Sequence, residues 1–240
     1  MPHYRDEAIV LRTHKLGEVD RILTLLTRHH GQIRAVAKGV RKTSSRFGAR
    51  LEPFMVADLQ LYEGRNLDTV SQAEQLANYG ASIVADYPRY TVASAMVEAA
   101  ERLTRESSSE THYLLLLGGL RTLANLERSP SSVLDSYLLR ALALSGWVPD
   151  LESCQLCGKP ADSFSVHTGA VSCQVCQQPG SLRLGESGLS LMRALLAGDW
   201  SVVDQLSETQ GERVSGVISG YLQWQLERGL RSMNHVERSN

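Results

Sequence analysis

The sequence lacks the features by which membrane proteins and secreted proteins are recognised. No apolar run approaches the roughly 20 residues that span a bilayer, and the first seven residues, MPHYRDE, have no signal-peptide pattern. We therefore expect a cytoplasmic protein. Its 240 residues are enough for one large domain or two small ones with a real core.

Recognisable catalytic patterns are also missing. The chain has no nucleophile elbow, no phosphate-binding loop and no pair of carboxylates placed for Mg²⁺. His29 and His30 stand beside Gly31 and are interpreted as turn residues, not catalytic groups. We therefore expect a protein that is not an enzyme.

Acidic residues are absent from one long stretch. From Arg21 to Leu51 there are eight Lys or Arg residues and no Asp or Glu, although the net charge of the whole chain is only −1. Such a basic segment favours a nucleic-acid partner, and a solvated charged face is the alternative. The residues expected to contact the nucleic acid are Arg34, Lys38, Arg41, Lys42, Arg46 and Arg50. Phe47 is the only Phe, Tyr or Trp in this stretch, so we expect contacts to the phosphate backbone without base readout.

The four cysteines all fall into two Cys-x2-Cys pairs. Cys154 and Cys157 form the first pair, and Cys173 and Cys176 form the second after an interval of fifteen residues. Each pair predicts a tight turn that directs two thiolates to one side, and two such turns complete a tetrahedron around Zn²⁺. Four thiolates leave no open position for substrate, so we expect one structural zinc ion. An iron centre, two disulfides or unliganded thiols are the alternatives.

The hydrophobic pattern changes near residue 80. Before that point, short alternating segments predict a five-stranded barrel such as an OB-fold. After it, leucine-rich segments with helical spacing predict a helical domain. We therefore expect an α+β fold: an OB-fold in residues 1–80, a helical domain in residues 81–240 and a zinc module inserted at about 151–180. The expected strands are 7–13, 20–28, 32–38, 55–62 and 67–74, with a long loop at 39–53. The expected helices are 88–105, 110–127, 130–146, 186–196, 200–206 and 211–233.

Several segments resemble the bacterial RecO family of recombination mediators. They are residues 4–11 (YRDEAIVL), 16–21 (LGEVDR), 35–41 (AVAKGVR), 45–54 (SRFGARLEPF) and 137–149 (YLLRALALSGWVP). The resemblance covers nearly the whole chain. It implies an N-terminal OB-fold, a helical domain and, in many members, a zinc module of four cysteines.

The resemblance also implies an activity and partners. Members of the family bind single- and double-stranded DNA and promote annealing. They work with RecR, and they act on strands coated by single-strand-binding protein so that the RecA recombinase can load. The six basic residues would then be the DNA contacts, and the protein would be associated with the nucleoid.

Arg140 is the candidate for binding the acidic tail of single-strand-binding protein, because the resemblance places that tail on the helical domain. The guanidinium can grip a carboxylate with two hydrogen bonds. The apolar groove expected beside it is formed by Leu138, Leu139, Leu142 and Leu144. An ion pair of Arg140 with Glu101 or Glu127 is the alternative.

Two other functions compete with that of a mediator. A zinc-ribbon regulatory factor would read base sequence, but no recognition helix with clustered Arg, Asn and Gln is evident. A nuclease would need carboxylates positioned for Mg²⁺. Strand annealing with and without Mg²⁺ separates the three functions.

Overall fold

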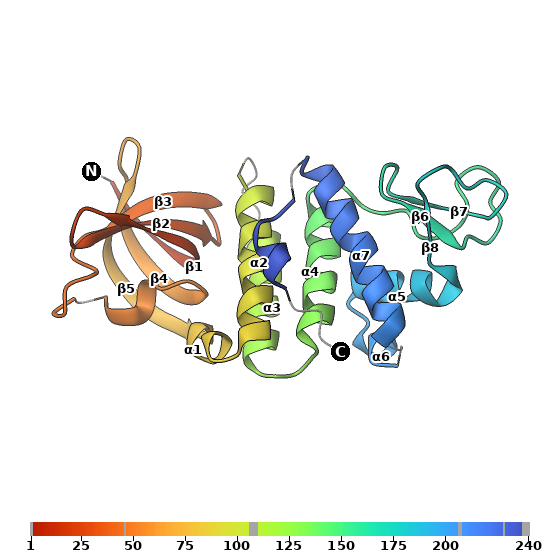
Figure 1. Ribbon diagram of the computed structural model, residues 1–240. Helices are drawn as coiled ribbons and strands as arrows, with labels where there is room; N and C mark the ends of the chain where they lie inside the picture. Colours follow the sequence, from red (N-terminus) through yellow and green to blue (C-terminus); the bar gives the residue numbers. More distant parts are fainter. Residues whose placement is uncertain (1, 46, 106–109, 206–207, 228, 237–240) are drawn as a thin grey trace. The chain divides into compact units, whose positions relative to one another are not determined.

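The computed structural model describes residues 2–45, 47–105, 110–205, 208–227 and 229–236. The chain forms two compact units, Met1–Glu127 and Arg128–Asn240 (Figure 1). Of the helices in the described ranges, none is long and apolar enough to cross a membrane.

The first unit begins with a closed five-stranded barrel. Its strands are β1 (His3–Leu16), β2 (Asp20–Thr27), β3 (Gln32–Ala37), β4 (Met55–Tyr62) and β5 (Asp68–Asn78). Their order around the barrel is β1-β2-β3-β5-β4. The long β1 pairs antiparallel with both β2 and β4, and a short parallel pairing of β3 with β5 closes the barrel. The predicted OB-fold is therefore confirmed.

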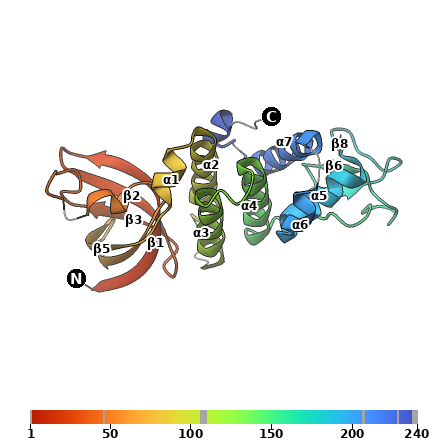
Figure 2. The ribbon, with the colours of Figure 1, turned by 90° about the horizontal axis from the view of Figure 1, so that it is seen from below.

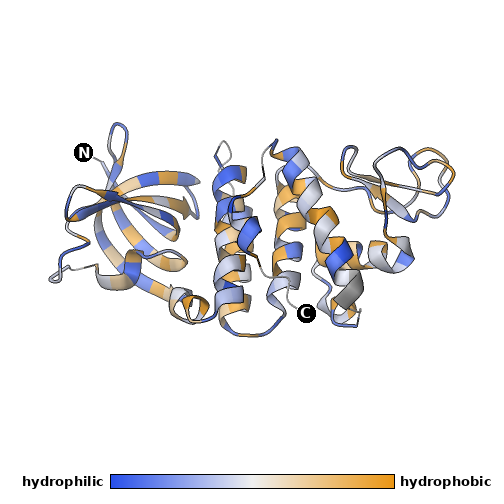
Figure 3. Ribbon diagram, viewed as in Figure 1, coloured by the Kyte–Doolittle hydropathy of each residue, from blue (hydrophilic) through white to orange (hydrophobic). Residues whose placement is uncertain are grey.

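The barrel core follows from alternation along the strands, because successive side chains of a strand point to opposite faces. Figure 3 shows this as alternating apolar and polar bands on the barrel strands. The buried inward residues include Ala8, Val10, Leu23, Leu25, Ala35, Ala37, Ala57, Leu59 and Leu61. The intervening side chains, such as Arg34 of β3, are exposed. The same pattern that builds the core thus directs Arg34, the cation of β3, outward.

A buried carboxylate, Asp6 of β1, fixes the turn between β2 and β3. The backbone N–H groups of His29 and His30 each donate to Oδ2 of Asp6 at 3.1 Å. Their Nδ1 atoms lie 2.9 and 2.6 Å from the two carboxylate oxygens. Burial would raise the pKa of Asp6, but the hydrogen bonds from His30 and His29 outweigh it, so the pKa lies below its ordinary value. The two histidines lie in the turn, as predicted.

Three helices complete the first unit: α1 (Tyr79–Val84), α2 (Tyr87–Leu103) and α3 (Glu110–Ala124). Helix α2 packs against β1, β2 and α3, and Figure 2 shows α1 between the barrel and α2. Asp86 caps α2 by accepting a hydrogen bond from the N–H of Arg89 at 3.0 Å. An ion pair of Arg12 with Glu101, at 3.1 Å, joins β1 to α2.

The second unit combines helices with a small sheet. Its helices are α4 (Pro130–Leu144), α5 (Gly185–Ala197), α6 (Trp200–Val203) and α7 (Glu208–Gln225), followed by the short 3-10 helix η2 (Ser232–His235). Helices α4, α5 and α7 pack against one another. Between α4 and α5 the chain forms the strands β6 (Ser163–Ser165), β7 (Ala170–Ser172) and β8 (Leu182–Arg183), in the order β7-β6-β8. The sheet is held to α7 by Phe164, whose ring meets Tyr221 edge-on with centroids 5.5 Å apart.

The α+β fold class is confirmed, with differences in detail. Helix α1 and the three strands of the cysteine region were not predicted, and the helix predicted to reach residue 233 ends at Gln225. The chain passes from barrel to helix at Tyr79, whereas the first compact unit continues to Glu127. The division into domains at residue 80 stays a prediction.

Candidate nucleic-acid interface and metal centre

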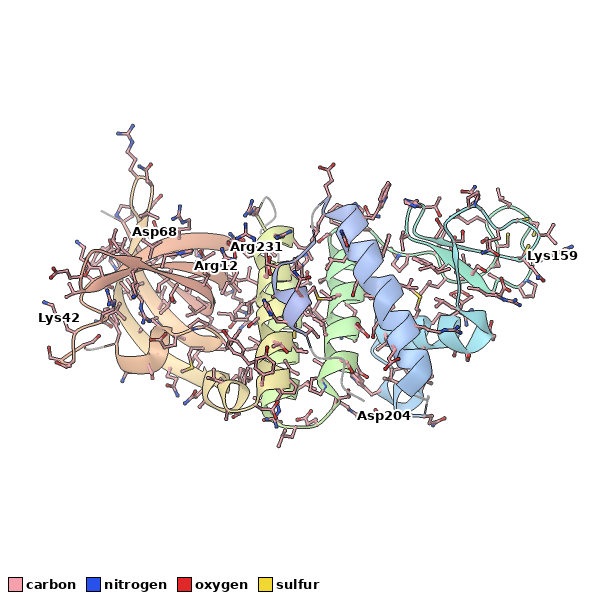
Figure 4. All side chains as sticks on the ribbon, in the orientation of Figure 1. Arg12, Lys42, Asp68, Lys159, Asp204 and Arg231 are labelled. Atoms are coloured by element: carbon pink, nitrogen blue, oxygen red, sulfur yellow. The ribbon has the colours of Figure 1, made fainter. Side chains whose placement is uncertain are left out.

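The candidate DNA-binding segment runs from β3 to β4, residues 32–54, and we call it the basic segment. Its Arg34, Lys38 and Lys42 are exposed, and they form no ion pair with any residue that the structure describes. Asp20 holds the start of the loop by accepting a hydrogen bond from the N–H of Gly39 at 2.7 Å. Lys42 extends outward from the loop at the edge of the barrel (Figure 4). These three cations are therefore available to an anionic partner.

Arg41 is different, because its side chain is engaged within the protein. Its Nη1 donates to the carbonyl oxygen of Glu18 at 2.8 Å, and its backbone N–H donates to the carbonyl oxygen of Val19 at 3.0 Å. Both acceptors belong to the turn between β1 and β2. Arg41 thus ties the basic segment to that turn and still leaves other guanidinium N–H groups for a phosphate.

Arg50 lies on the 3-10 helix η1 (Gly48–Leu51). Phe47 and Leu51 bury their side chains in the barrel core and so anchor this helix. Nη1 of Arg50 donates to the carbonyl oxygen of Ala73 on β5 at 3.4 Å. Arg46 lies outside the described residues. Of the six predicted contacts, three have side chains without a protein partner in the described residues (Arg34, Lys38 and Lys42). Arg41 and Arg50 donate hydrogen bonds within the protein, and Arg46 is not among the described residues.

Two further cations of the acid-free stretch are neutralised by acids from outside it. Arg21 pairs with Glu52 at 2.6 Å. Arg28 pairs with Glu7 at 3.2 Å and with Glu110 at 2.8 Å. Counting charges along the sequence therefore overstates the positive charge of this surface.

Arg65 is an exposed cation that was not predicted from the sequence as a DNA contact. Arg65 is exposed in the turn between β4 and β5 and pairs with no acid in the part of the chain that the structure describes. In OB-folds this turn, together with the turn between β1 and β2, borders the ligand-binding face. The predicted OB-fold already indicated this turn, between the strands expected at 55–62 and 67–74, so Arg65 could have been named from the sequence.

The four cysteines converge on one point, as their spacing predicts. All four Sγ atoms lie within 4.8 Å of one another, and those of Cys157 and Cys173 are 3.6 Å apart. A tetrahedral ion with Zn–S bonds near 2.3 Å requires sulfurs about 3.8 Å apart. The residues present therefore fit one tetrahedral metal ion.

The backbone of the two turns prepares the thiols for metal. The carbonyl oxygen of Cys154 accepts hydrogen bonds from the N–H groups of Cys157 at 3.3 Å and Gly158 at 2.8 Å. The φ of Gly158 is +69°, a conformation that favours glycine. In the second turn the N–H of Cys176 donates to the carbonyl oxygen of Cys173 at 3.1 Å.

Hydrogen bonds also favour the thiolate form of two of these cysteines. Backbone N–H groups, chiefly that of Cys173, lower the pKa of Cys154 to about 6. The pKa of Cys173 is lowered as well, chiefly by the N–H of Cys176. The side chain of Cys157 raises the pKa of Cys176. The thiolate is the form that binds metal.

Arg140 is exposed on α4, but its surroundings differ from those expected. Leu138, Leu139 and Leu142 are fully buried, so the predicted groove of four leucines is wrong. Their periodic spacing reflects a helix that packs on most of its sides. Leu144 is exposed and, one turn further on, shares a face with Arg140.

The two acids considered as ion-pair partners of Arg140 each have a partner within their own compact unit. Glu101 pairs with Arg12, and Glu127 accepts a hydrogen bond from Asn125 at 2.9 Å. Within the second unit, Nη1 of Arg140 lies beside Gly198, the residue that caps the C-terminal end of α5; a Cβ on that glycine would stand 3.4 Å from it. The role of Arg140 in partner binding stays a prediction.

Comparison with known proteins decides the family. Residues 1–79 match the family model described as Recombination protein O N terminal, and residues 84–234 match Recombination protein O C terminal. The chain belongs to the RecO family. Similar proteins called DNA repair protein RecO occur in Nocardioides sp. (52% identical, covering 98% of this chain and 99% of the relative) and Thermobifida fusca (51% identical, covering 100% of both).

Membership of the RecO family supports a role in DNA repair and recombination. The two RecO family models leave out only residues 80–83 between them, which lie within α1. Both the barrel with its basic segment and the cysteine cluster thus lie within segments matched by the RecO models.

Proposed function

We propose that this RecO-family protein is a recombination mediator that binds single- and double-stranded DNA and promotes annealing of complementary strands. In this role it helps to load RecA onto strands coated by single-strand-binding protein, with RecR as a partner and without covalent chemistry. The observation that carries the proposal is the row of exposed cations on the barrel of a RecO-family chain. The expected cytoplasmic location, in association with the nucleoid, stays a prediction.

The proposed DNA contacts are Arg34, Lys38, Arg41, Lys42, Arg46 and Arg50. Arg34 and Lys38 stand on β3 and directly after it, and Lys42 continues the row along the loop. Cations in such a row can follow a phosphate chain whatever its sequence. Arg65 in the turn between β4 and β5 is a further candidate.

A strand-annealing assay tests this function. We expect faster annealing of complementary strands of several unrelated sequences, with or without Mg²⁺ and with no loss of strand length. Cleavage that depends on Mg²⁺ would identify a nuclease instead. Annealing or binding restricted to one sequence would identify a regulatory factor that reads bases.

We also propose that Cys154, Cys157, Cys173 and Cys176 hold one Zn²⁺ ion per chain. Four sulfur ligands at tetrahedral spacing suit zinc, and they leave no position for a reacting molecule. The ion would cross-link the two cysteine turns. The region around them has only short strands with which to hold itself together.

Arg140 is proposed to bind the acidic tail of single-strand-binding protein, with the exposed Leu144 as its apolar neighbour. Arg140→Ala should weaken binding of the tail peptide about tenfold or more, because a charge-assisted hydrogen bond contributes about 1.5–3 kcal/mol. Binding to naked DNA should stay nearly unchanged. Arg213→Ala, which removes an exposed cation of α7, is the matched control. Equal loss of peptide and DNA binding, or loss of neither, would contradict the role of Arg140.

A further inference from the structure

The basic segment ends at a residue with unusual backbone geometry, Phe54. Its φ is +68°, in the left-handed region that residues with a side chain rarely adopt. The N–H of Phe54 donates to the carbonyl oxygen of Val10 at 3.0 Å, and its side chain is buried. A conformation of this kind persists only where the surroundings hold it, and it is often found at functional sites.

The ring of Phe54 supports an exposed tyrosine. It meets Tyr90 of α2 edge-on, with centroids 6.0 Å apart and an interplanar angle of 82°. Tyr90 is 44% exposed, and Tyr87, three positions earlier, is 55% exposed. Residues three apart are neighbours on one face of a helix. Two exposed tyrosines therefore lie side by side where the basic segment ends.

A second contact fixes this arrangement. Helix α1, which precedes α2, approaches the basic segment so closely that a Cβ on Gly80 would stand 3.2 Å from the carbonyl oxygen of Pro53. The first turn of α2 is thus tied to the segment both through α1 and through Phe54. All of these residues belong to one compact unit, Met1–Glu127.

The packing of α2 does not account for the exposed tyrosines. The helix is anchored by fully buried residues further along, such as Val92, Met96 and Ala99. In the ranges that the structure describes, neither tyrosine hydroxyl forms a hydrogen bond. Exposed aromatic side chains that stack on bases, together with cations that bind the phosphates, are typical of surfaces that bind single strands.

The acids near this surface do not oppose an anionic ligand. The Asp86 carboxylate caps α2 and lies 3.5 Å from Nε of Arg89. Glu52, two residues before Phe54, is paired with Arg21 at 2.6 Å. Both acids are therefore neutralised by adjacent guanidinium groups.

We propose that Tyr87 and Tyr90 form a stacking platform for unpaired bases of single-stranded DNA whose phosphates lie on the basic segment. This inference rests on the proposed DNA binding and adds a site for the bases. Aromatic rings stack on the faces of all four bases, so the platform is indifferent to sequence. In a duplex those faces are covered by neighbouring base pairs, so the platform favours single strands. It supplies the stacking surface that the basic segment itself lacks, since Phe47 is buried.

The test compares a double variant, Tyr87→Ala with Tyr90→Ala, on three probes: a 30-nucleotide thymidine strand, an abasic strand of equal length and a duplex. Stacking contributes about 1–3 kcal/mol per base, so binding of the thymidine strand should weaken at least about fivefold. Binding of the abasic strand and of the duplex should change less than about twofold. The slope of log K against log salt should be unchanged, because no phosphate contact is removed.

Control variants separate stacking from folding. Tyr87→Phe with Tyr90→Phe keeps both rings and should bind like the unaltered protein. Tyr62→Ala removes an exposed tyrosine of β4 and should not affect binding. Tyr87→Ala alone leaves the contact of Tyr90 with Phe54 intact and should still weaken binding of the thymidine strand.

Two results would overturn the platform without affecting the proposed DNA binding. If both alanine variants bind the thymidine strand as the unaltered protein does, the tyrosines do not stack on bases, and a protein partner becomes the alternative ligand of this surface. Equal loss on all three probes would mean that the tyrosines support the fold. Failure of the unaltered protein to bind any probe would instead contradict the proposed function and, with it, the platform.

Discussion

Replacing Cys154 by Ser should release the metal ion and unfold the region at about residues 151–183, while the barrel stays folded. Cys154 is buried among the four sulfurs, and the region's own sheet consists of strands of three, three and two residues. Leu156 is 69% exposed, which leaves Leu151, Phe164 and Val171 as the large buried apolar side chains of the region. Metal binding supplies on the order of 10 kcal/mol in small zinc modules, far more than these contacts provide.

The measurement has two parts. Elemental analysis of protein purified without chelator should find about one zinc per chain, and clearly less in the Cys154→Ser variant. Limited proteolysis should then cut the variant near residues 151–183, whereas DNA binding by the barrel persists. Gln174→Ala changes an exposed residue of the second cysteine turn and should keep its zinc. Unaltered protein that contains no metal would refute the zinc site.

Replacing Arg34, Lys38 and Lys42 together by Ala should weaken DNA binding roughly 100-fold at 0.15 M salt. In the described residues these three exposed side chains form neither an ion pair nor a hydrogen bond, so the substitutions break no side-chain contact of either kind found there. With about six phosphates contacted, log K should fall with log salt at a slope of about −4 to −5. The triple variant should reduce the magnitude of that slope by about 2 to 3, equally for all sequences.

Binding titrations at several salt concentrations measure this effect. Arg5→Ala is the control, because Arg5 is an exposed cation of β1 that is paired with Asp58 at 2.6 Å. It should leave the slope nearly unaltered. Arg41→Ala should change the slope less than the triple variant does. It should also make the turn between β1 and β2 more mobile, because the hydrogen bond from the Arg41 side chain to that turn is lost. An unaltered slope in the triple variant would place the DNA elsewhere.

Much of the fold was predictable because its signals are local. Alternation at Ile33, Ala35 and Ala37 correctly predicted the buried face of β3, and the cysteine spacing predicted the convergence of the four sulfurs. Helix α1 was missed because its six residues are too few to show a helical period, although Asn78 caps it. The strands β6 to β8 are shorter still.

What the sequence could not reveal depends on contacts between distant residues. Arg41 looked like a free cation, but it binds carbonyl oxygens more than twenty positions earlier in the chain. The leucines of α4 looked like a groove because spacing does not show how many sides of a helix are covered. No sequence pattern marks Tyr87 and Tyr90 as candidate binding residues, because Tyr90 contacts Phe54, 36 positions away, only in the folded chain.

The two-residue pairing that closes the barrel has a consequence for how the protein folds. Strands β1, β2 and β3 follow one another through short turns, so they can form a hairpin meander early. The N-terminal half of β1 pairs with β4, which comes later in the chain, so this pairing can form only after β4 is in place. The seam that closes the barrel, between β3 and β5, consists of the pairs Ala35 with Asp68 and Val36 with Thr69. Closing that seam requires the ends of a long loop to meet, which is entropically costly, so we expect it to form last. Amide hydrogens along this seam should exchange faster than those between β1 and β2, so local opening should begin beside Arg34.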